Sequence, residues 1–447
     1  MSARILFCCW PFEGHVFPQL SMALALRERG NEVAFYTGAR LQETIEAAGV
    51  RVFPFAQIEP AWLAVQERER EVGGRRQSQR VQYQAFRQWL VETIPSQVED
   101  LRSIIAEWKA DVIVTDASMW GTSLVVHEAV PIPVALASPL ITAVIPGPDA
   151  PPPGSGLEPA HNARGRVRAW AIARATQLLG RGLRRRLDEL RAGYGLAPMG
   201  CGVNEYCGRL PLYMVLSVAE LDFNRKDLPP SVHYVGACTW HPPEPPGTSA
   251  WLDQLPSDRP WVHVTEGTSH YQDPFVLRAA VEGLAGGPLE AIITHGRDRR
   301  PEELGLSSTA PNVHLAPWLS HDALLPRCAA LVTTGGAGSV MAGLRAGVPL
   351  VLVPTTWDKP DNARRVVAAG AGVILAPRRC TPTSLREAVE RVLAQPSYRE
   401  AAQRCAALLA KAPGPAGAAE LIEALAPSQD YASGAGAGRP EVERTLS

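Results

Sequence analysis

The sequence lacks an excess of charge of either sign, a long hydrophobic run and a signal-like N-terminus. Its 44 lysines and arginines nearly balance its 45 aspartates and glutamates, so nothing points to a nucleic-acid partner. No segment reaches the roughly 18 consecutive apolar residues that a membrane span needs. The apolar run at the N-terminus ends at Glu13, too early for a secretory signal. We therefore expect a cytoplasmic protein with no integral membrane contact.

The eight cysteines also lack a pattern that would indicate disulfides or a metal site. They are scattered along the chain, and the closest non-adjacent pair, Cys201 and Cys207, does not have the spacing of zinc ligands. The sequence therefore predicts buried, reduced thiols and no bound metal.

The apolar segments of the first half alternate between short strands and amphipathic helices. The chain has 447 residues, and a prior of about 150 residues per domain makes two domains the simplest division. "RILFCCW" (4–10), a helix with Pro18 near its start and "EVAFYTG" (32–38) form a βαβ unit. "DVIVTD" (111–116) and "IPVALAS" (132–138) add further strands. This alternation predicts a parallel, doubly wound sheet.

A Pro-rich segment, "HPPEPPGTSA" (241–250), has the composition of an interdomain linker. The alternation restarts after it with "WVHVTEG", "LEAIITHG", "NVHLAP", "AALVTTGG" and "PLVLVP". We therefore predict one Rossmann-like domain over residues 1–240 and a second over 251–426, whose last helix is able to pack back on the first. The small, polar tail at 427–447 is predicted to be disordered.

Three segments do not follow the alternation. Residues 59–108 are polar with scattered aromatics, and they predict helices over the binding edge of the first sheet. Residues 146–159, "PGPDAPPPGSGLEP", predict a mobile surface loop. Residues 164–193 contain a run of arginines that predicts a solvated helix face, with an anion site as the alternative.

The stretch "AALVTTGGAGSVMAGLRAGVP" (329–349) runs from a strand into a helix through a glycine-rich turn. Gly335, Gly336 and Gly338 form the turn, and Ser339 follows. Glycines let a backbone come close to an anion, and a helix N-terminus offers unpaired N–H groups. No lysine precedes the serine, which excludes a Walker A loop. Taken alone, the turn fits anion binding and tight strand–helix packing equally well.

The turn is one of several motifs that resemble a known family in their order and spacing. The others are "EGHVFPQL" (13–20), "DVIVTD" (111–116), "VTEGTS" (264–269), "APWLSHDALL" (316–325) and "WDKPDNARRV" (357–366). Together they resemble the family 1 nucleotide-sugar-dependent glycosyltransferases, most of all the bacterial members that glycosylate small natural products. The resemblance covers roughly residues 4 to 425. It implies a GT-B fold, in which two Rossmann-like doubly wound domains face a cleft, with acceptor on the first and donor on the second.

The resemblance implies a catalytic pair in the first half. His15 matches the general base that takes a proton from the acceptor hydroxyl, a task that suits an imidazole because its pKa lies near neutrality. Asp116 matches the carboxylate that orients this base. Without the motif, a structural histidine and a helix N-cap are the ordinary interpretations of these two residues.

The resemblance also implies a donor site in the second half. Trp318, seven residues before a matching leucine, Leu325, occupies the position at which the nucleobase stacks. Thr268, Gly335, Gly336, Gly338 and Ser339 match positions near the diphosphate, and Asp358 and Asn362 match positions near the sugar. Two positions depart from the family. Thr334 stands where a phosphate-contacting His is usual and Lys359 where a Gln is usual, so the cation at 359 compensates in our interpretation for the charge missing at 334.

The expected reaction is an inverting, metal-independent transfer that needs no cofactor. The donor is a UDP- or dTDP-sugar, and the acceptor is a hydroxyl of a small, apolar natural product. Two alternatives stay open, and the departures at Thr334 and Lys359 motivate the first of them. One is an inert GT-B protein that binds a nucleotide or a partner, and the other is an epimerase or hydrolase acting on the nucleotide sugar. The sequence does not specify the acceptor, the sugar or the oligomeric state.

Overall fold

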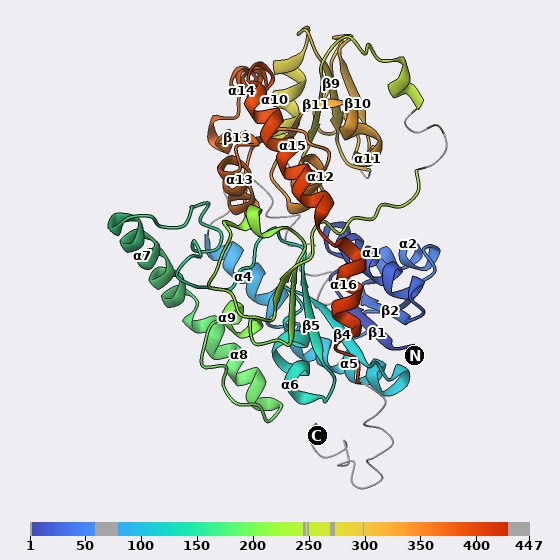
Figure 1. The fold of residues 1–447 in the computed structure, drawn as a ribbon, viewed down its shortest axis with the longest axis vertical. Coiled ribbons are helices and arrows are strands. Elements are labelled where there is room, and N and C mark those ends of the chain that lie inside the picture. The colour runs from blue at the N-terminus through green and yellow to red at the C-terminus, as the bar shows by residue number, and fades with distance from the viewer. Residues whose placement is uncertain are drawn as a thin grey trace.

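The computed structural model describes residues 2–58, 79–244, 247, 250–268, 273–297 and 299–427, which fold around two separate β-sheets (Figure 1). Each sheet forms the centre of one half of the molecule, and the halves lie one above the other along the long axis. The predicted segment at 59–78, part of the linker and the tail from 428 lie outside the described residues. None of the described helices is both long and apolar enough to cross a bilayer.

The first sheet is parallel throughout, with its strands in the order β3-β2-β1-β4-β5-β6-β7. The strands are β1 (Arg4–Cys8), β2 (Glu32–Thr37), β3 (Arg51–Pro54), β4 (Val112–Asp116), β5 (Val134–Ser138), β6 (Leu212–Val215) and β7 (Val232–Tyr234). Strands β3, β6 and β7 were not expected from the sequence, because runs of three or four residues give little periodicity. The order reverses direction between β1 and β4, which makes their carboxyl ends a topological switch point.

The second sheet is also parallel, in the order β10-β9-β8-β11-β12-β13. Its strands are β8 (Trp261–Thr265), β9 (Glu290–Thr294), β10 (Val313–Ala316), β11 (Cys328–Thr333), β12 (Leu350–Leu352) and β13 (Gly372–Ile374). Its switch point lies between β8 and β11. Two parallel, doubly wound sheets confirm the predicted fold class.

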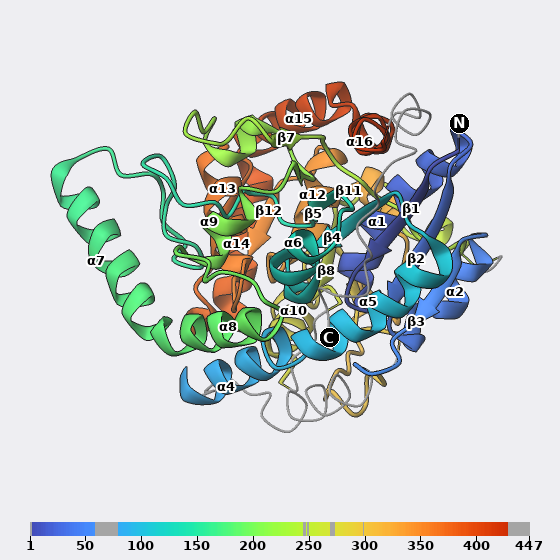
Figure 2. The same cartoon turned by 90° about the horizontal axis from the view of Figure 1, so that it is seen from below.

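Helices cover both faces of each sheet, as Figures 1 and 2 show. In the first half they are α1 (Glu13–Glu28), α2 (Gln42–Ala47), α4 (Gln79–Leu90), α5 (Ile94–Trp108), α6 (His127–Ala129), α7 (Ala163–Leu179), α8 (Arg181–Gly193) and α9 (Val203–Cys207). In the second half they are α10 (Phe275–Leu284), α11 (His321–Leu324), α12 (Ala337–Arg345), α13 (Lys359–Ala368), α14 (Pro382–Ala394) and α15 (Pro396–Lys411). The last helix, α16 (Gly414–Glu423), lies against the first half. Basic α7 projects from the body of the molecule, and none of its side chains is buried.

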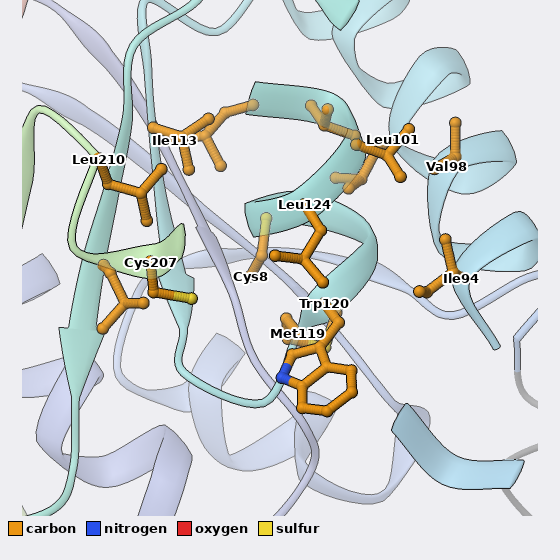
Figure 3. Packing of buried hydrophobic residues seen from close by; sticks show 14 of the residues in the cluster. Cys8, Ile94, Val98, Leu101, Ile113, Met119, Trp120, Leu124, Cys207 and Leu210 are labelled. Carbon is orange, nitrogen blue, oxygen red and sulfur yellow. The ribbon is translucent and has the colours of Figure 1, made fainter. Parts of the chain in front are cut away.

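Alternate residues of the central strands pack on opposite faces of the sheets. In β1, Leu6 and Cys8 belong to one apolar cluster, whereas Ile5 and Phe7 belong to the other. Figure 3 shows the first cluster, in which Val98 and Leu101 of α5 lie opposite Leu124, a residue of the π-helical turn Thr122–Val126 that follows β4. A strand that is buried on both faces has a continuous run of apolar residues. The central strands could therefore be predicted from the sequence. All eight cysteines are buried and unpaired, as predicted.

The chain returns to its first half at the end. Helix α16 packs along α1, and Ala418, Ala419 and Ile422 join the apolar cluster beneath the first sheet. Arg29, the residue after α1, adds an ion pair to Glu423 at 2.7 Å. The last helix therefore connects the end of the second half to the first half.

Two further contacts join the halves at helix α13. The N–H groups of Gly154 and Gly156 donate to the carboxylate of Asp361 at 2.6 and 2.8 Å. The segment 146–159 contains no helix or strand, which confirms the predicted loop, and these hydrogen bonds anchor it to the second half. Arg365, one turn further along α13, donates to the buried carboxylate of Asp222 at 2.6 and 2.9 Å. These contacts hold α13 against the first half.

Candidate active site

The residues singled out in the sequence lie at the two switch points of the sheets. His15 lies in the first turn of α1, directly after β1, and Asp116 is the last residue of β4. In the second half, Thr268 follows β8 and the glycine turn follows β11. Parallel strands of one sheet present their carboxyl ends at the same edge, so each switch point gathers side chains from two strands.

His15 and Asp116 form a hydrogen-bonded pair. Nδ1 of His15 lies 2.8 Å from Oδ2 of Asp116, whose side chain has no exposed surface. The other oxygen, Oδ1, accepts hydrogen bonds from the Ser118 N–H at 2.7 Å and from the Ser118 hydroxyl. The carboxylate therefore keeps its charge without contact with water and fixes the tautomer of the imidazole. With the proton on Nδ1, the Nε2 atom of His15 is left as the basic nitrogen.

The environment tunes both pKa values in the direction that favours an ion pair. Burial alone would lower the pKa of His15, but the charge and hydrogen bond of Asp116, with a smaller contribution from Asp358, outweigh it and raise the pKa. Burial would raise the pKa of Asp116, but His15 and the Ser118 hydrogen bonds lower it. The negative charge of Asp358, from the second half, acts on the pKa of His15 in the same direction as that of Asp116.

The glycines of the turn after β11 differ in what surrounds them. Gly335 has a φ of 88°, and a Cβ there would lie 3.3 Å from the Lys359 carbonyl oxygen. A Cβ on Gly336 or Gly338, in contrast, would meet nothing within 4 Å. Packing therefore accounts for Gly335 but not for the other two, which open the N-terminus of α12 to an approaching group. Ser339 lies in the first turn of this helix.

Asn362 of α13 braces this turn. Its Nδ2 donates to the Gly335 carbonyl at 3.0 Å and to Oδ2 of Asp358 at 2.6 Å. Burial raises the pKa of Asp358, and the Asn362 hydrogen bond opposes this rise. One amide group therefore links the glycine turn to the carboxylate that faces the first half.

The two positions that depart from the family are occupied in ways that the sequence did not reveal. The Thr334 hydroxyl is buried and donates to the Glu266 carbonyl at 2.9 Å, so its proton is not available for a phosphate. Lys359 is buried as well, and its Nζ donates to the Thr355 hydroxyl at 3.2 Å. Thr334 thus joins the ends of β8 and β11. Of these two positions, Lys359 alone brings a charged side chain to the site.

A buried ion pair at the end of β8 was missed in the sequence. The Glu266 carboxylate lies 3.2 Å from Nη1 of Arg299 and is fully buried. Burial raises the pKa of Glu266, and the positive charges of Arg299 and Lys359 oppose this. Its position between strand and glycine in "VTEGTS" was the available signal, because a charged residue at a strand end is unusual in an apolar run.

Thr268 and Trp318 lie at different places along the same sheet edge. The hydroxyl of Thr268 lies 3.8 Å from the position of a Cβ on Gly14, beside the start of α1. The structure therefore brings Thr268 next to the His15 turn. Trp318 follows β10, three strand positions from β11, and its half-buried ring lies 4.1 Å beneath the guanidinium of Arg297. That cation–π contact is another feature the sequence did not reveal.

Comparisons with known proteins agree with this architecture. Residues 287–425 match the family model of the erythromycin biosynthesis protein CIII-like C-terminal domain. The chain is 34% identical over 440 residues to 4'-demethylrebeccamycin synthase of Lentzea aerocolonigenes, covering 95% of this chain and 100% of that protein.

Solved structures share the fold over nearly the whole chain. The glycosyltransferase of kitacinnamycin superposes with a TM-score of 0.73 at 23% identity, covering 96% of this chain and 100% of the other. The glycosyltransferase VinC in complex with dTDP superposes with a TM-score of 0.66 at 19% identity, covering 95% and 99%. With the near full-length relative, these findings show that the chain belongs to the bacterial natural-product type of the family 1 glycosyltransferases and has their GT-B fold.

Proposed function

We propose that this glycosyltransferase moves a sugar from a UDP- or dTDP-sugar to a hydroxyl of a small, apolar acceptor, with inversion and without a metal ion or cofactor. The observation that carries the proposal is the His15–Asp116 pair, which lies beside Thr268 of the second half. A general base and a sugar-binding carboxylate must meet across the two halves for a direct transfer. The complex of VinC with dTDP supports thymidine diphosphate as one of the two leaving groups that we propose.

In the proposed reaction, Nε2 of His15 takes the proton of the acceptor hydroxyl. The hydroxyl oxygen forms a bond to the anomeric carbon while the bond from that carbon to the diphosphate oxygen breaks on the opposite face. The proton remains on His15, where the Asp116 carboxylate stabilises the imidazolium. General-base catalysis of this kind contributes about 100- to 10,000-fold.

The leaving diphosphate is received by the turn after β11. Gly336 and Gly338 leave the N–H groups of the α12 N-terminus accessible, and Ser339 adds a hydroxyl. Thr268 lies beside the turn that carries His15, and its neighbour Gly267 lies beside Ser339, so we assign its hydroxyl to the diphosphate. Lys359 balances part of the negative charge, whereas Thr334 acts only by joining the strands.

The nucleobase and the sugar of the donor bind at opposite ends of the proposed donor site. Trp318 stacks on the nucleobase, with Arg297 covering the other face of the indole ring or moving aside when the base binds. Asp358 accepts hydrogen bonds from the sugar hydroxyls, and Asn362 holds it in place. The sugar is thereby oriented with its anomeric carbon towards His15.

Thermal stabilisation by nucleoside diphosphates tests the donor site. A ligand at 100 times its dissociation constant adds about 2.7 kcal/mol to the free energy of unfolding, an easily measured shift. We expect UDP or dTDP to stabilise the wild type, and Trp318→Ala and Ser339→Ala to lose most of this shift. Trp170→Ala is the matched control, because Trp170 is 64% exposed on projecting α7. Full stabilisation of the Trp318 and Ser339 variants would rule out this donor site.

A further inference from the structure

A continuous series of aromatic rings leads from His15 in the first half to Trp357 in the second. The ring of Phe12 lies 5.4 Å from that of His15, and the ring of Trp89 lies 5.8 Å from that of Phe12. Trp89 in turn lies 6.0 Å from Trp357, which directly precedes Asp358. Phe86, on the same helix α4 as Trp89, stacks on Trp357 at 5.8 Å with an interplanar angle of 23°. We call Phe12, Phe86, Trp89 and Trp357 the aromatic arc.

The aromatic arc keeps exposed surface, unlike the rings behind it. Trp357 is 50% exposed, and Phe12, Phe86 and Trp89 are half-buried. Behind them, Trp10 packs on Trp89 and Trp120 packs on Phe86, and both of these supporting rings are buried. A second layer of buried rings thus supports the first layer from behind. Exposed apolar patches on a rigid support are typical of ligand-binding surfaces.

The backbone at Trp357 is in an unusual conformation. Its φ of 62° lies in the left-handed region, where a bulky residue is a genuine outlier. Such conformations persist only where the surroundings enforce them, and they concentrate at ligand-binding positions. Here the strained residue projects a large ring between the halves, immediately before the carboxylate assigned to the sugar. A residue without a ring would satisfy the turn as well.

The position of the aromatic arc relative to the reacting groups identifies what it contacts. The acceptor hydroxyl must reach Nε2 of His15 while the anomeric carbon is held near Asp358. The acceptor body therefore lies between these two residues, along the side where the arc connects them. Flat aromatic faces interact best with other π systems, in offset-stacked or edge-to-face geometry.

We propose that the aromatic arc is an acceptor subsite that selects a planar aromatic molecule, with Trp357 as the residue that sets this specificity. The proposal rests on the proposed function, because the location of the acceptor follows from the roles of His15 and Asp358. It narrows the proposed class of acceptors from apolar molecules in general to aromatic molecules. It also predicts that the second half, which binds the donor, takes part in acceptor selection.

A matched pair of alcohols tests the proposal with the full-length protein. 2-Naphthalenemethanol and its saturated analogue, decahydro-2-naphthalenemethanol, share a carbon skeleton and a primary hydroxyl, so they differ in aromaticity and not in hydroxyl chemistry. Product formation is measured with UDP- and dTDP-sugars. Two or three aromatic contacts predict about tenfold higher kcat/KM for the aromatic alcohol.

Variants of Trp357 decide whether the arc causes this preference. Trp357→Ala is expected to reduce it to within about threefold, and Trp357→Phe to retain most of it, because a ring remains. Ile374→Ala, at another exposed apolar residue of the second half, should keep the wild-type ratio. Equal use of both alcohols by the wild type, or an unchanged preference in Trp357→Ala, would overturn the proposal.

Equilibrium binding separates failure of this proposal from failure of the proposed function. Binding of the two alcohols is measured by isothermal titration with and without dTDP or UDP. The same preference in binding supports the arc even where no product forms, whereas absence of binding or equal binding overturns it. If a nucleotide stabilises the protein but the two alcohols bind equally, the proposed donor site is supported and the aromatic arc is rejected as an acceptor subsite.

Discussion

The two halves of the molecule use the same strand–turn–helix element for different chemistry. After β1, the turn into α1 presents His15, whose partner Asp116 comes from the neighbouring strand β4. After β11, the turn into α12 presents backbone N–H groups and Ser339. In the first half the functional groups are ionisable side chains, whereas in the second they are mainly backbone dipoles. In the function we propose, one topology would thus serve proton transfer in one sheet and anion binding in the other.

The two turns also differ in the residue that holds each of them in place. In the first half the buried Asp116 carboxylate holds the imidazole, and its own charge is satisfied by Ser118. In the second half Asn362 holds the shape of the backbone at Gly335. Substitutions that remove charge should therefore act on rate and pH dependence in the first half. Substitutions that change backbone shape should act on stability and nucleotide affinity in the second.

The largest effect is expected for His15→Gln. Loss of a well-placed general base should reduce kcat about 100- to 10,000-fold with an alcohol acceptor of ordinary pKa. Stabilisation by nucleoside diphosphate should remain near the wild-type value, because the donor site lies on the other half. The measurement pairs initial rates with thermal shifts. A His15→Gln enzyme that retains most of its transfer rate would contradict the assignment of the base.

The next effect concerns the ion pair that holds the halves together. Arg365 and Asp222 are 3% and 0% exposed, and Asp222 also accepts hydrogen bonds from Thr142 and Tyr234. Arg365→Met should lower the free energy of unfolding by about 3 kcal/mol, because it leaves a buried carboxylate without its cation. Urea denaturation measures this loss. Arg386→Met, at an exposed arginine of α14, is the control and should change stability by less than about 0.5 kcal/mol.

The main features of the site were predicted from the resemblance to the family, whose motifs are local stretches of sequence. His15 lies in the helix that follows β1 and Asp116 ends β4, and the topology of a parallel sheet then places them together because β1 and β4 are neighbours. The glycine turn is similarly local. The fold class followed from the same alternation of strands and helices, although the short strands β3, β6 and β7 escaped it.

The rest of the site depends on long-range contacts that no local pattern encodes. Asp222 and Arg365 are 143 residues apart, and Gly154 and Asp361 are 207 apart. The hydroxyl of Thr334 could have pointed towards a phosphate, but the approach of β8 directs it to the Glu266 carbonyl. Trp357 is apolar in a loop and gave no periodic signal, so its contact with α4 became evident only in three dimensions.

Substitutions at two neighbouring glycines of the second half should have different effects, one on the stability of the fold and the other on nucleotide affinity. Gly335→Ala places a Cβ at a φ of 88° and 3.3 Å from a carbonyl, and should cost about 1–2 kcal/mol of stability. Gly336→Ala has no such clash and should fold with wild-type stability. Its methyl group would instead point into the space proposed for the diphosphate and weaken UDP or dTDP binding about tenfold. Equal losses in both variants, by thermal denaturation and nucleotide titration, would argue against this difference.

The smallest effect, and the most specific to the first half, is on pH dependence. The pKa of His15 is raised, and the base works in its neutral form, so the rate should rise with pH and level off above the raised pKa. Asp116→Asn removes the partner charge and should move this rise to lower pH, because burial then lowers the pKa of His15.

Stability should change with pH in the opposite direction from activity. A raised pKa means that the folded state holds the proton more tightly than the unfolded state, whose His pKa is about 6.5. The stabilisation is therefore complete below that value and is lost as pH rises through the pKa of the folded protein. The melting temperature of the wild type relative to His15→Gln should thus fall between acidic and mildly alkaline pH, while the rate rises. A rate profile that Asp116→Asn leaves in place would mean that some other group in the first half takes the proton.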